Sequence, residues 1–285
     1  MLNQGAMTIT IIGIGLIGGS MSLALKEKGF ADKVIGVDAN PEHCRKAMEL
    51  GLVDEIKNIE EAVKASGLVI LATPINAVET LLPVIMPLVD RQVVMDVGST
   101  KKVICESAAS FPNRGRFVAT HPMWGTEYSG PEAAVKDAFK GKATVICDKE
   151  NSEADAVALV EEIYGLLGMH LVYMNAGDHD VHVAYVSHIS HITSFALANT
   201  VLEKEKEGDA IFELASGGFE STVRLAKSNP AMWVPIFMQN KENVLDVLNE
   251  HIAQLRKFKA CLEKENYDYL QELIVNANGI KRILK

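Results

Sequence analysis

The chain has 285 residues, of which 48% are hydrophobic and 23% are charged, and its formal net charge is -9. This composition is typical of a globular protein that is long enough for two domains. The negative charge, without a basic stripe, argues against a nucleic-acid partner. No apolar run approaches the roughly 18 to 20 residues that a membrane span needs. Four cysteines without C-x-x-C spacing favour reduced thiols, and the N-terminus has no signal-peptide pattern, so we expect a cytoplasmic protein.

The first apolar stretch, TITII followed by GIGLIGGS, is typical of a strand, a tight turn and a helix. The glycines have G-x-G-x-x-G spacing. Gly13 allows the tight turn, Gly15 lets the backbone approach a pyrophosphate, and Gly18 lets the helix pack close to the strand. The start of the helix, at Leu16 and Ile17, offers unpaired N–H groups to phosphates. The stretch therefore predicts a dinucleotide site.

A second apolar strand at 34–37 ends in Asp38, 20 residues after Gly18. An acid at this distance accepts hydrogen bonds from a ribose 2′-hydroxyl and repels a 2′-phosphate. Asp38 therefore favours NAD over NADP. The alternative is an empty βαβ unit whose glycines serve packing alone, but strand, glycines, helix and acid all stand in register here.

Strands and helices then alternate as far as residue 174. In an open parallel sheet, ligands bind beyond the carboxyl ends of the strands. Thr73 and Pro74, Ser99 and His121 each follow a predicted strand, so we expect them on the rim that holds the glycine loop. The alternation predicts an α/β fold, with a Rossmann-like, doubly wound and mostly parallel sheet in residues 1–174. The further strands are predicted at 68–72, 93–97, 117–119, 143–147 and 170–174, and helices at 44–50, 60–65 and about 152–167.

The remaining part, 175–285, is predicted to be an all-α domain. Asn229-Pro230 supplies a cap followed by proline at the first helical position. About 110 residues of helix cannot bury several long apolar faces alone, so we expect substrate-binding helices that also pack across a homodimer. The other helices are predicted at 181–207, 221–227, 240–265 and 267–283.

His121 is the first candidate for chemistry. Its position at the ligand end of the sheet would let the imidazole accept a proton from a substrate hydroxyl while hydride leaves the same carbon. A lone histidine is also often structural. Ser99 could orient the same hydroxyl or hold His121, or it could be a turn residue or helix cap.

Four histidines follow, His179, His182, His188 and His191. At 100° per residue one α-helix cannot aim all four at a single metal ion, so we expect no metal site. His188 and His191 share a face, and Ser187 stands over His191, so this side of the helix could line a polar cleft. The alternative is that these are surface or satisfied core histidines.

Arg224 is predicted to lie within a short helix among apolar neighbours. A guanidinium in such company is often a bidentate carboxylate binder, and an internal salt bridge to a protein acid is equally consistent with the sequence. Trp233 is more typical of a core residue than of a ligand platform.

Taken together, these motifs resemble the prephenate dehydrogenase family over nearly the whole chain. The resemblance implies NAD-linked oxidative decarboxylation of prephenate to 4-hydroxyphenylpyruvate in tyrosine biosynthesis. The matching segments are GIGLIGGS, the Ala72-Thr73-Pro74 turn, DVGS with Lys101, HPM followed by GTE, Ser187-His188 with His191, and RLAKS with Met232-Trp233.

The resemblance also implies roles for single residues. His121 would take the proton of the ring hydroxyl, Ser99 would orient that hydroxyl, and Arg224 would bind a substrate carboxylate. The other residues implied in substrate binding or in ordering the pocket are His191, Ser187, Thr126 and Glu127.

Three positions depart from the family pattern. Trp124 stands where alanine is common, Ser221 replaces an acid three residues before the arginine, and Pro235 replaces a more usual acid. These changes leave the choice between prephenate and its amino counterpart arogenate open.

Two rival functions remain at this point. A dehydrogenase of the 3-hydroxyacid type shares the expected architecture, but it usually relies on a catalytic lysine in the helical domain. This chain offers Lys204 and Lys206 only near the end of a helix. The other rival is a non-catalytic module that senses NAD and signals through its dimer.

Overall fold

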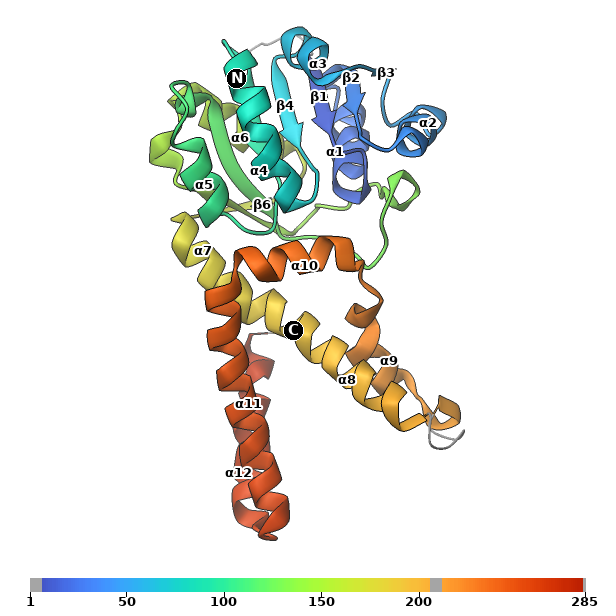
Figure 1. Cartoon of the computed structure of the whole chain (residues 1–285), viewed down its shortest axis with the longest axis vertical. Helices are drawn as coiled ribbons and strands as arrows, with labels where there is room; N and C mark the ends of the chain where they lie inside the picture. The colour runs from blue at the N-terminus through green and yellow to red at the C-terminus, as the bar shows by residue number, and fades with distance from the viewer. Residues whose placement is uncertain (1–6, 206–211, 284–285) are drawn as a thin grey trace.

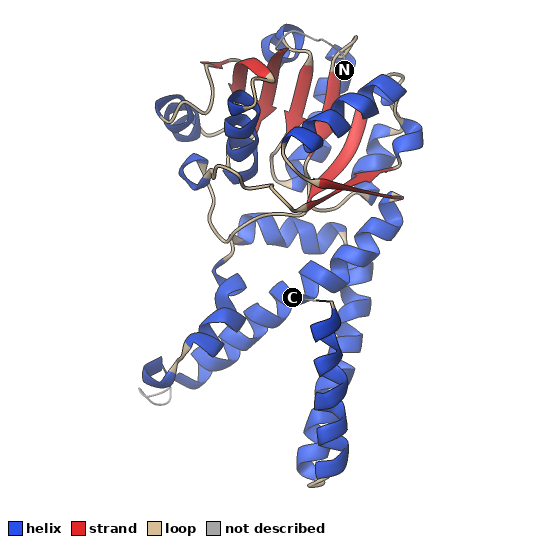
Figure 2. Ribbon diagram, turned by 180° about the vertical axis from the view of Figure 1, so that it is seen from behind, coloured by secondary structure: helices blue, strands red, loops and turns tan. Residues whose placement is uncertain are grey.

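The computed structural model describes residues 7–205 and 212–283. An α/β part comes first and an all-helical part follows, and Figures 1 and 2 show the helices gathered beneath one end of the sheet. The predicted fold class is confirmed. The predicted boundary at 174 falls between the last strand and the first helix of the helical part.

One eight-stranded sheet forms the α/β part, in the order β3-β2-β1-β4-β5-β6-β7-β8. Every neighbouring pair is parallel except β6 and β7. The strand order reverses between β1 and β4, and ligands of doubly wound folds bind at such a reversal. The strands are β1 Met7–Ile12, β2 Ala31–Val37, β3 Glu55–Ile56, β4 Leu68–Leu71, β5 Val93–Asp96, β6 Phe117–Pro122, β7 Ala143–Cys147 and β8 His170–Met174.

Helices cover both faces of the sheet and bury an apolar cluster on each (Figure 2). α2 begins earlier than predicted because Asn40 caps it, accepting a hydrogen bond from the Glu42 N–H, with Pro41 at the first position. We did not predict α4 and α5. The helices are α1 Leu16–Glu27, α2 Pro41–Glu49, α3 Ile59–Ala65, α4 Ile75–Ile85, α5 Lys102–Ala108 and α6 Ala154–Leu166.

The carboxyl ends of four strands form one rim. Ile12 pairs with Leu71, Leu71 with Asp96, and Asp96 with Ala119, so these residues stand in one row. His121 was predicted to follow its strand, but it lies within β6. The antiparallel strand β7 extends the pairing to the end of β6 and sets His121 opposite Val145.

The helical part differs from prediction at several places. The helix predicted at 221–227 begins at Gly217, and the one predicted at 267–283 ends at Ala277. The predicted helix at 181–207 begins at Ala176 and is interrupted by a π turn, and its last two residues lie outside the described ones. Arg224 stands at the junction of a helix and a 3-10 turn instead of within a helix. The elements are α7 Ala176–Val183, the π turn Ala184–His188, α8 Ile189–Glu205, α9 Gly217–Val223, the 3-10 turn Arg224–Lys227, α10 Pro230–Gln239, α11 Lys241–Glu263 and α12 Tyr267–Ala277.

Two helical arms project from the body of the protein. α10 runs beneath the sheet, while α8 with α9 and α11 with α12 diverge from it (Figures 1 and 2). No helix in the described part of the chain is long and apolar enough to cross a membrane. Large apolar side chains are exposed along the second arm, among them Leu245, Leu255, Leu262, Ile274 and Val275.

Replacing Gly13 with alanine tests the turn after β1. Gly13 has φ +94°, and a Cβ there would lie 2.6 Å from the carbonyl oxygen of Ala72, the residue that follows β4. We expect Gly13→Ala to lower the free energy of unfolding by about 2–4 kcal/mol, measured by urea denaturation. Gly15→Ala is the matched control, because a Cβ there meets nothing within 4 Å. Equal stability of the two variants would contradict this account of the turn.

Candidate active site at the carboxyl rim of the sheet

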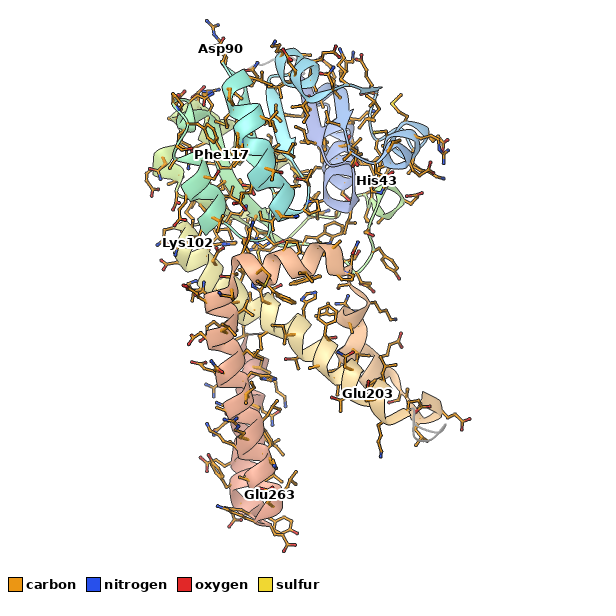
Figure 3. All side chains as sticks on the ribbon, in the orientation of Figure 1. His43, Asp90, Lys102, Phe117, Glu203 and Glu263 are labelled. Atoms are coloured by element: carbon orange, nitrogen blue, oxygen red, sulfur yellow. The ribbon has the colours of Figure 1, made fainter. Side chains whose placement is uncertain are left out.

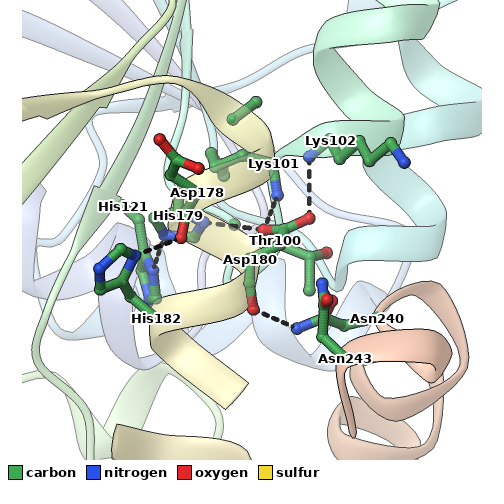
Figure 4. A network of polar contacts seen from close by, with 12 residues as sticks. Thr100, Lys101, Lys102, His121, Asp178, His179, Asp180, His182, Asn240 and Asn243 are labelled. Atoms are coloured by element: carbon green, nitrogen blue, oxygen red, sulfur yellow. Dashed lines mark hydrogen bonds and ion pairs between the residues drawn. The ribbon is translucent and has the colours of Figure 1, made fainter. Parts of the chain in front are cut away.

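His121 is held by a chain of side chains that begins in the helical part. Its Nδ1 lies 2.9 Å from Nε2 of His179, and Nδ1 of His179 lies 2.8 Å from Oδ1 of Asp180. Both partners come from α7, and both are buried. Figure 4 shows the three side chains in sequence.

This chain fixes which nitrogen of His121 is basic. The Asp180 carboxylate only accepts hydrogen bonds, so Nδ1 of His179 donates to it and Nε2 of the neutral ring is an acceptor. Nδ1 of His121 must therefore donate to His179. The Nε2 atom of His121 keeps its lone pair, as a general base requires.

Asp180 connects the two parts of the molecule. Its Oδ1 accepts the Lys101 N–H at 2.8 Å and its Oδ2 accepts the Lys102 N–H at 3.0 Å, at the start of α5. Its backbone carbonyl accepts a hydrogen bond of 2.7 Å from the Asn240 side chain, which also contacts Nδ1 of His188. A carboxylate suits a helix N-terminus, where N–H groups lack partners within the helix.

Burial keeps these rings neutral. Removal of the His121 ring from water lowers its pKa well below the ordinary 6.5, and the positive charge of Lys101 lowers it further. Burial likewise lowers the pKa of His179, although Asp180 opposes the shift. The pKa of His188 falls to about 4 for the same reason. His121 is therefore in its proton-accepting form at neutral pH.

The glycine loop lies at the reversal of strand order. Gly13 sits directly against Ala72 at the end of β4, whereas Gly15 opens to free space. Asp38 stands after β2, and its Oδ2 accepts the Ile14 N–H at 2.9 Å. The buried hydroxyl oxygen of Thr73 has no hydrogen-bond partner within the described residues. An open loop, a placed acid and an unpaired hydroxyl fit a dinucleotide.

Arg224 forms an ion pair with Glu127, from Nη1 to Oε2 at 2.8 Å. Glu127 lies in the loop after β6, so this pair connects the loop that follows His121 to the helical part. Arg224 keeps half of its side chain exposed, which leaves guanidinium N–H groups available to a further acid. Of the two roles open for Arg224, the internal salt bridge is present.

His188, His191 and Trp233 form an aromatic cluster in the helical part. His191 stacks on Trp233 with ring centroids 3.4 Å apart, and Trp233 meets His188 edge to face. The pKa of His191 is lowered by burial and also by the charge of Arg224. The buried Trp233 is a core residue, as predicted, although its ring N–H has no partner among the described residues.

The four histidines that suggested a metal have separate partners. His179 pairs with His121, His188 with Asn240, and Nδ1 of both His182 and His191 lies near the carbonyl oxygen four residues earlier. No group of three potential ligands is arranged for a metal within residues 7–205 and 212–283.

Other predicted site residues have smaller roles in this geometry. Ser99 is part-buried at the rim, and no hydrogen bond joins it to His121 in the described part of the chain. The Thr126 hydroxyl accepts the Tyr128 N–H, and the Ser187 carbonyl contacts His191. His179 and Asp180 were missed as site residues. The signal was a histidine and an acid side by side just after the last strand.

A doubly wound sheet with a glycine turn at its switch point and a neutral histidine on the same rim is the arrangement of a Rossmann-type dehydrogenase. Comparison with known proteins narrows this class. The nucleotide-binding domain of prephenate dehydrogenase matches residues 21–173, and the dimerization domain of prephenate dehydrogenase matches residues 175–276. The chain belongs to the prephenate dehydrogenase family.

Three relatives illustrate the likeness. Prephenate dehydrogenase from Bacillus subtilis is 31% identical over 94% of this chain and 74% of its own. The structure of prephenate dehydrogenase from A. aeolicus in complex with hydroxyphenyl propionate and NAD+ has a TM-score of 0.89, with 30% identity over 99% of each chain. Arogenate dehydrogenase from Synechocystis has a TM-score of 0.78, with 28% identity over 98% of this chain and 100% of that one.

The lowered histidine pKa values predict a loss of stability in acid. Each ring binds a proton near pH 6.5 in the unfolded chain but resists it when folded, so the unfolded state binds more protons below that pH. We expect the free energy of unfolding to fall as the pH drops from 7 toward 5, measured by urea denaturation. His179→Gln should flatten this dependence, whereas exposed His170→Gln should not. A flat profile in the unaltered protein would contradict the buried neutral rings.

Proposed function

We propose that this chain is an NAD-dependent prephenate dehydrogenase, an oxidoreductase that converts prephenate to 4-hydroxyphenylpyruvate and carbon dioxide in tyrosine biosynthesis. The family and the full-length likeness to the A. aeolicus enzyme support this proposal. The observation that carries it is a neutral His121 whose Nδ1 donates to His179, so that Nε2 keeps its lone pair, on the rim that holds the nucleotide loop.

The dinucleotide would lie across the ends of β1 and β4. Gly13, Gly15 and Gly18 would admit the pyrophosphate, with the N–H groups of Leu16 and Ile17 at the start of α1 beside it. Asp38 would accept the ribose hydroxyls, and Thr73 and Pro74 would border the nicotinamide side. The bound cofactor supplies the hydride acceptor.

His121 accepts the proton of the ring hydroxyl as hydride leaves the carbon that bears it. Loss of the ring carboxylate as carbon dioxide makes the ring aromatic, so no group must protonate the product ring. The protein therefore contributes chiefly a base and a fixed geometry. Ser99 orients the hydroxyl from the same rim.

Arg224 binds a substrate carboxylate. When that carboxylate binds, the guanidinium would either release Glu127 or contact both acids. The loop after β6, which carries Glu127, would therefore shift when substrate binds. His191, Ser187 and Thr126 complete the wall around the substrate side chain.

Arogenate is the second candidate substrate, because arogenate dehydrogenase from Synechocystis is similar over its full length. Two of the residues that depart from the family pattern, Trp124 and Ser221, bear on the choice between the two substrates. Trp124 packs edge to face on Phe139, and Ser221 is exposed on α9 with its hydroxyl on the Gly218 carbonyl. Ser221 offers no carboxylate that could bind the ammonium group of arogenate, and this favours prephenate.

The proposal includes a homodimer in the cytoplasm. The helical part carries exposed apolar side chains along both projecting arms. Figure 3 shows the two arms, with Glu203 on one and Glu263 toward the tip of the other. A second copy would cover such surface. The four free thiols support a reducing compartment.

The test of activity is NADH formation at 340 nm with NAD and either prephenate or arogenate. We expect turnover with prephenate, and His121→Asn should lower kcat by about 10²–10⁴-fold. Because the pKa of His121 is lowered, kcat/KM should stay level as the pH falls through 6.5 and decline only below it. His182→Asn is the matched control, since that ring lies outside the chain to His121. No NADH with either substrate would refute the proposed function.

The dimer is tested on the arm formed by α11 and α12. Leu255 and Leu262 are 55% and 67% exposed, and we expect Leu255→Glu with Leu262→Glu to yield monomers in sedimentation velocity. Leu50→Glu is the control, because Leu50 is 49% exposed on the sheet part. A variant of the arm that remains dimeric would place the interface elsewhere.

A further inference from the structure

Lys101 is fully buried, as is its partner Asp96 at the end of β5. A lysine is almost never fully buried unless it is paired. Its ammonium forms an ion pair with Oδ2 of Asp96 and donates a hydrogen bond of 2.7 Å to the Thr120 carbonyl oxygen. The mechanism proposed above makes no use of this buried cation.

The side-chain ammonium and the main-chain N–H of Lys101 each contact a group that positions His121. Thr120 directly precedes His121, so the ammonium fixes the peptide from which His121 projects. The main-chain N–H of Lys101 donates to Oδ1 of Asp180, the same oxygen that accepts from His179. Figure 4 shows Lys101, Asp180 and His179 in this arrangement.

We propose that Lys101 is a positioning residue for His121. Its ammonium holds β6 at Thr120, the residue before His121. Its main-chain N–H holds the Asp180 carboxylate that orients His179. This inference rests on the proposed role of His121 as the base. It assigns a function to the buried pair, which a purely structural account would treat as packing.

The charge of Lys101 acts on the same ring. The ammonium disfavours a second positive charge on His121 and on His179. Asp96 partly cancels this field, so removal of the lysine alone also leaves an unpaired carboxylate near the ring. Both changes favour the imidazolium. The charged and titratable groups around Lys101 and His121 include Asp96, Cys105, Cys147, Asp148, Tyr164, His179, Asp180 and His188.

The experiment compares Lys101→Met and the double variant Lys101→Met/Asp96→Asn with the unaltered protein. The double variant removes both charges, which keeps the fold accessible if the single variant is unstable. Nitrogen-15 NMR of the histidine rings follows the titration and the tautomer of His121. We expect Lys101→Met to raise the titration midpoint by about one pH unit or more, and the double variant to raise it less.

Turnover provides the second readout. We expect kcat to fall by about 10-fold or more in both variants, since a displaced base loses its alignment, while KM for NAD changes little. Lys26→Met is the matched control, because Lys26 also donates to a carbonyl oxygen, that of Gly51, and to the carboxylate of Asp54. That lysine is remote from β6.

A folded double variant with unaltered kcat and unaltered His121 titration would overturn the inference. A purely structural role would lower the melting temperature without moving either readout. If the unaltered protein forms no NADH, the proposed function fails, but the NMR titration still decides whether Lys101 controls the His121 ring.

Discussion

The hydrogen bonds of one buried carboxylate determine the geometry of this site. Asp180 accepts two backbone N–H groups at the start of α5 and the ring N–H of His179. The acid comes from the helical part, whereas α5 belongs to the sheet part, so the same contact joins the two and sets the proton arrangement of His121. An uncompensated carboxylate or an unpaired N–H in this buried place would cost several kcal/mol.

The nucleotide side of the rim is built in the same way. Asp38 accepts the Ile14 N–H within the glycine loop and the Asn40 N–H that precedes α2. The loop is therefore held from the neighbouring strand before any ligand binds. In both halves of the site a carboxylate holds backbone N–H groups in place before any ligand binds. This is a form of preorganisation.

The features that the sequence could predict are those encoded locally. Strand β1, its glycines and Asp38 follow from spacing alone, and β7 and β8 lie where their apolar runs predicted. The contact between His121 and His179 could not be predicted, because it joins residues 58 positions apart and depends on how α7 meets the sheet. The partner of Arg224 stayed open for the same reason, since Glu127 lies 97 positions away.

Helical phase was a further obstacle to prediction. The periodicity of 3.6 residues assumed for the four histidines does not hold across the π turn at Ala184–His188. Two helices were not predicted: α4 follows Pro74 and contains a second proline, Pro83, whereas α5 has only seven residues. Local patterns therefore located the rim correctly, whereas side-chain partners required the tertiary structure.

The π turn also places a constraint on chain length. Such a turn holds one residue more than an α-helix of the same rise, so it rotates the start of α8 by about 100° relative to α7. His179 before the turn faces the sheet, while His188 and His191, at its end and beyond it, face Trp233. Loss of one residue from this segment would restore ordinary α-helical winding and rotate His188 and His191 away from Trp233. Substitutions there are tolerable in principle, but the number of residues is not free to vary.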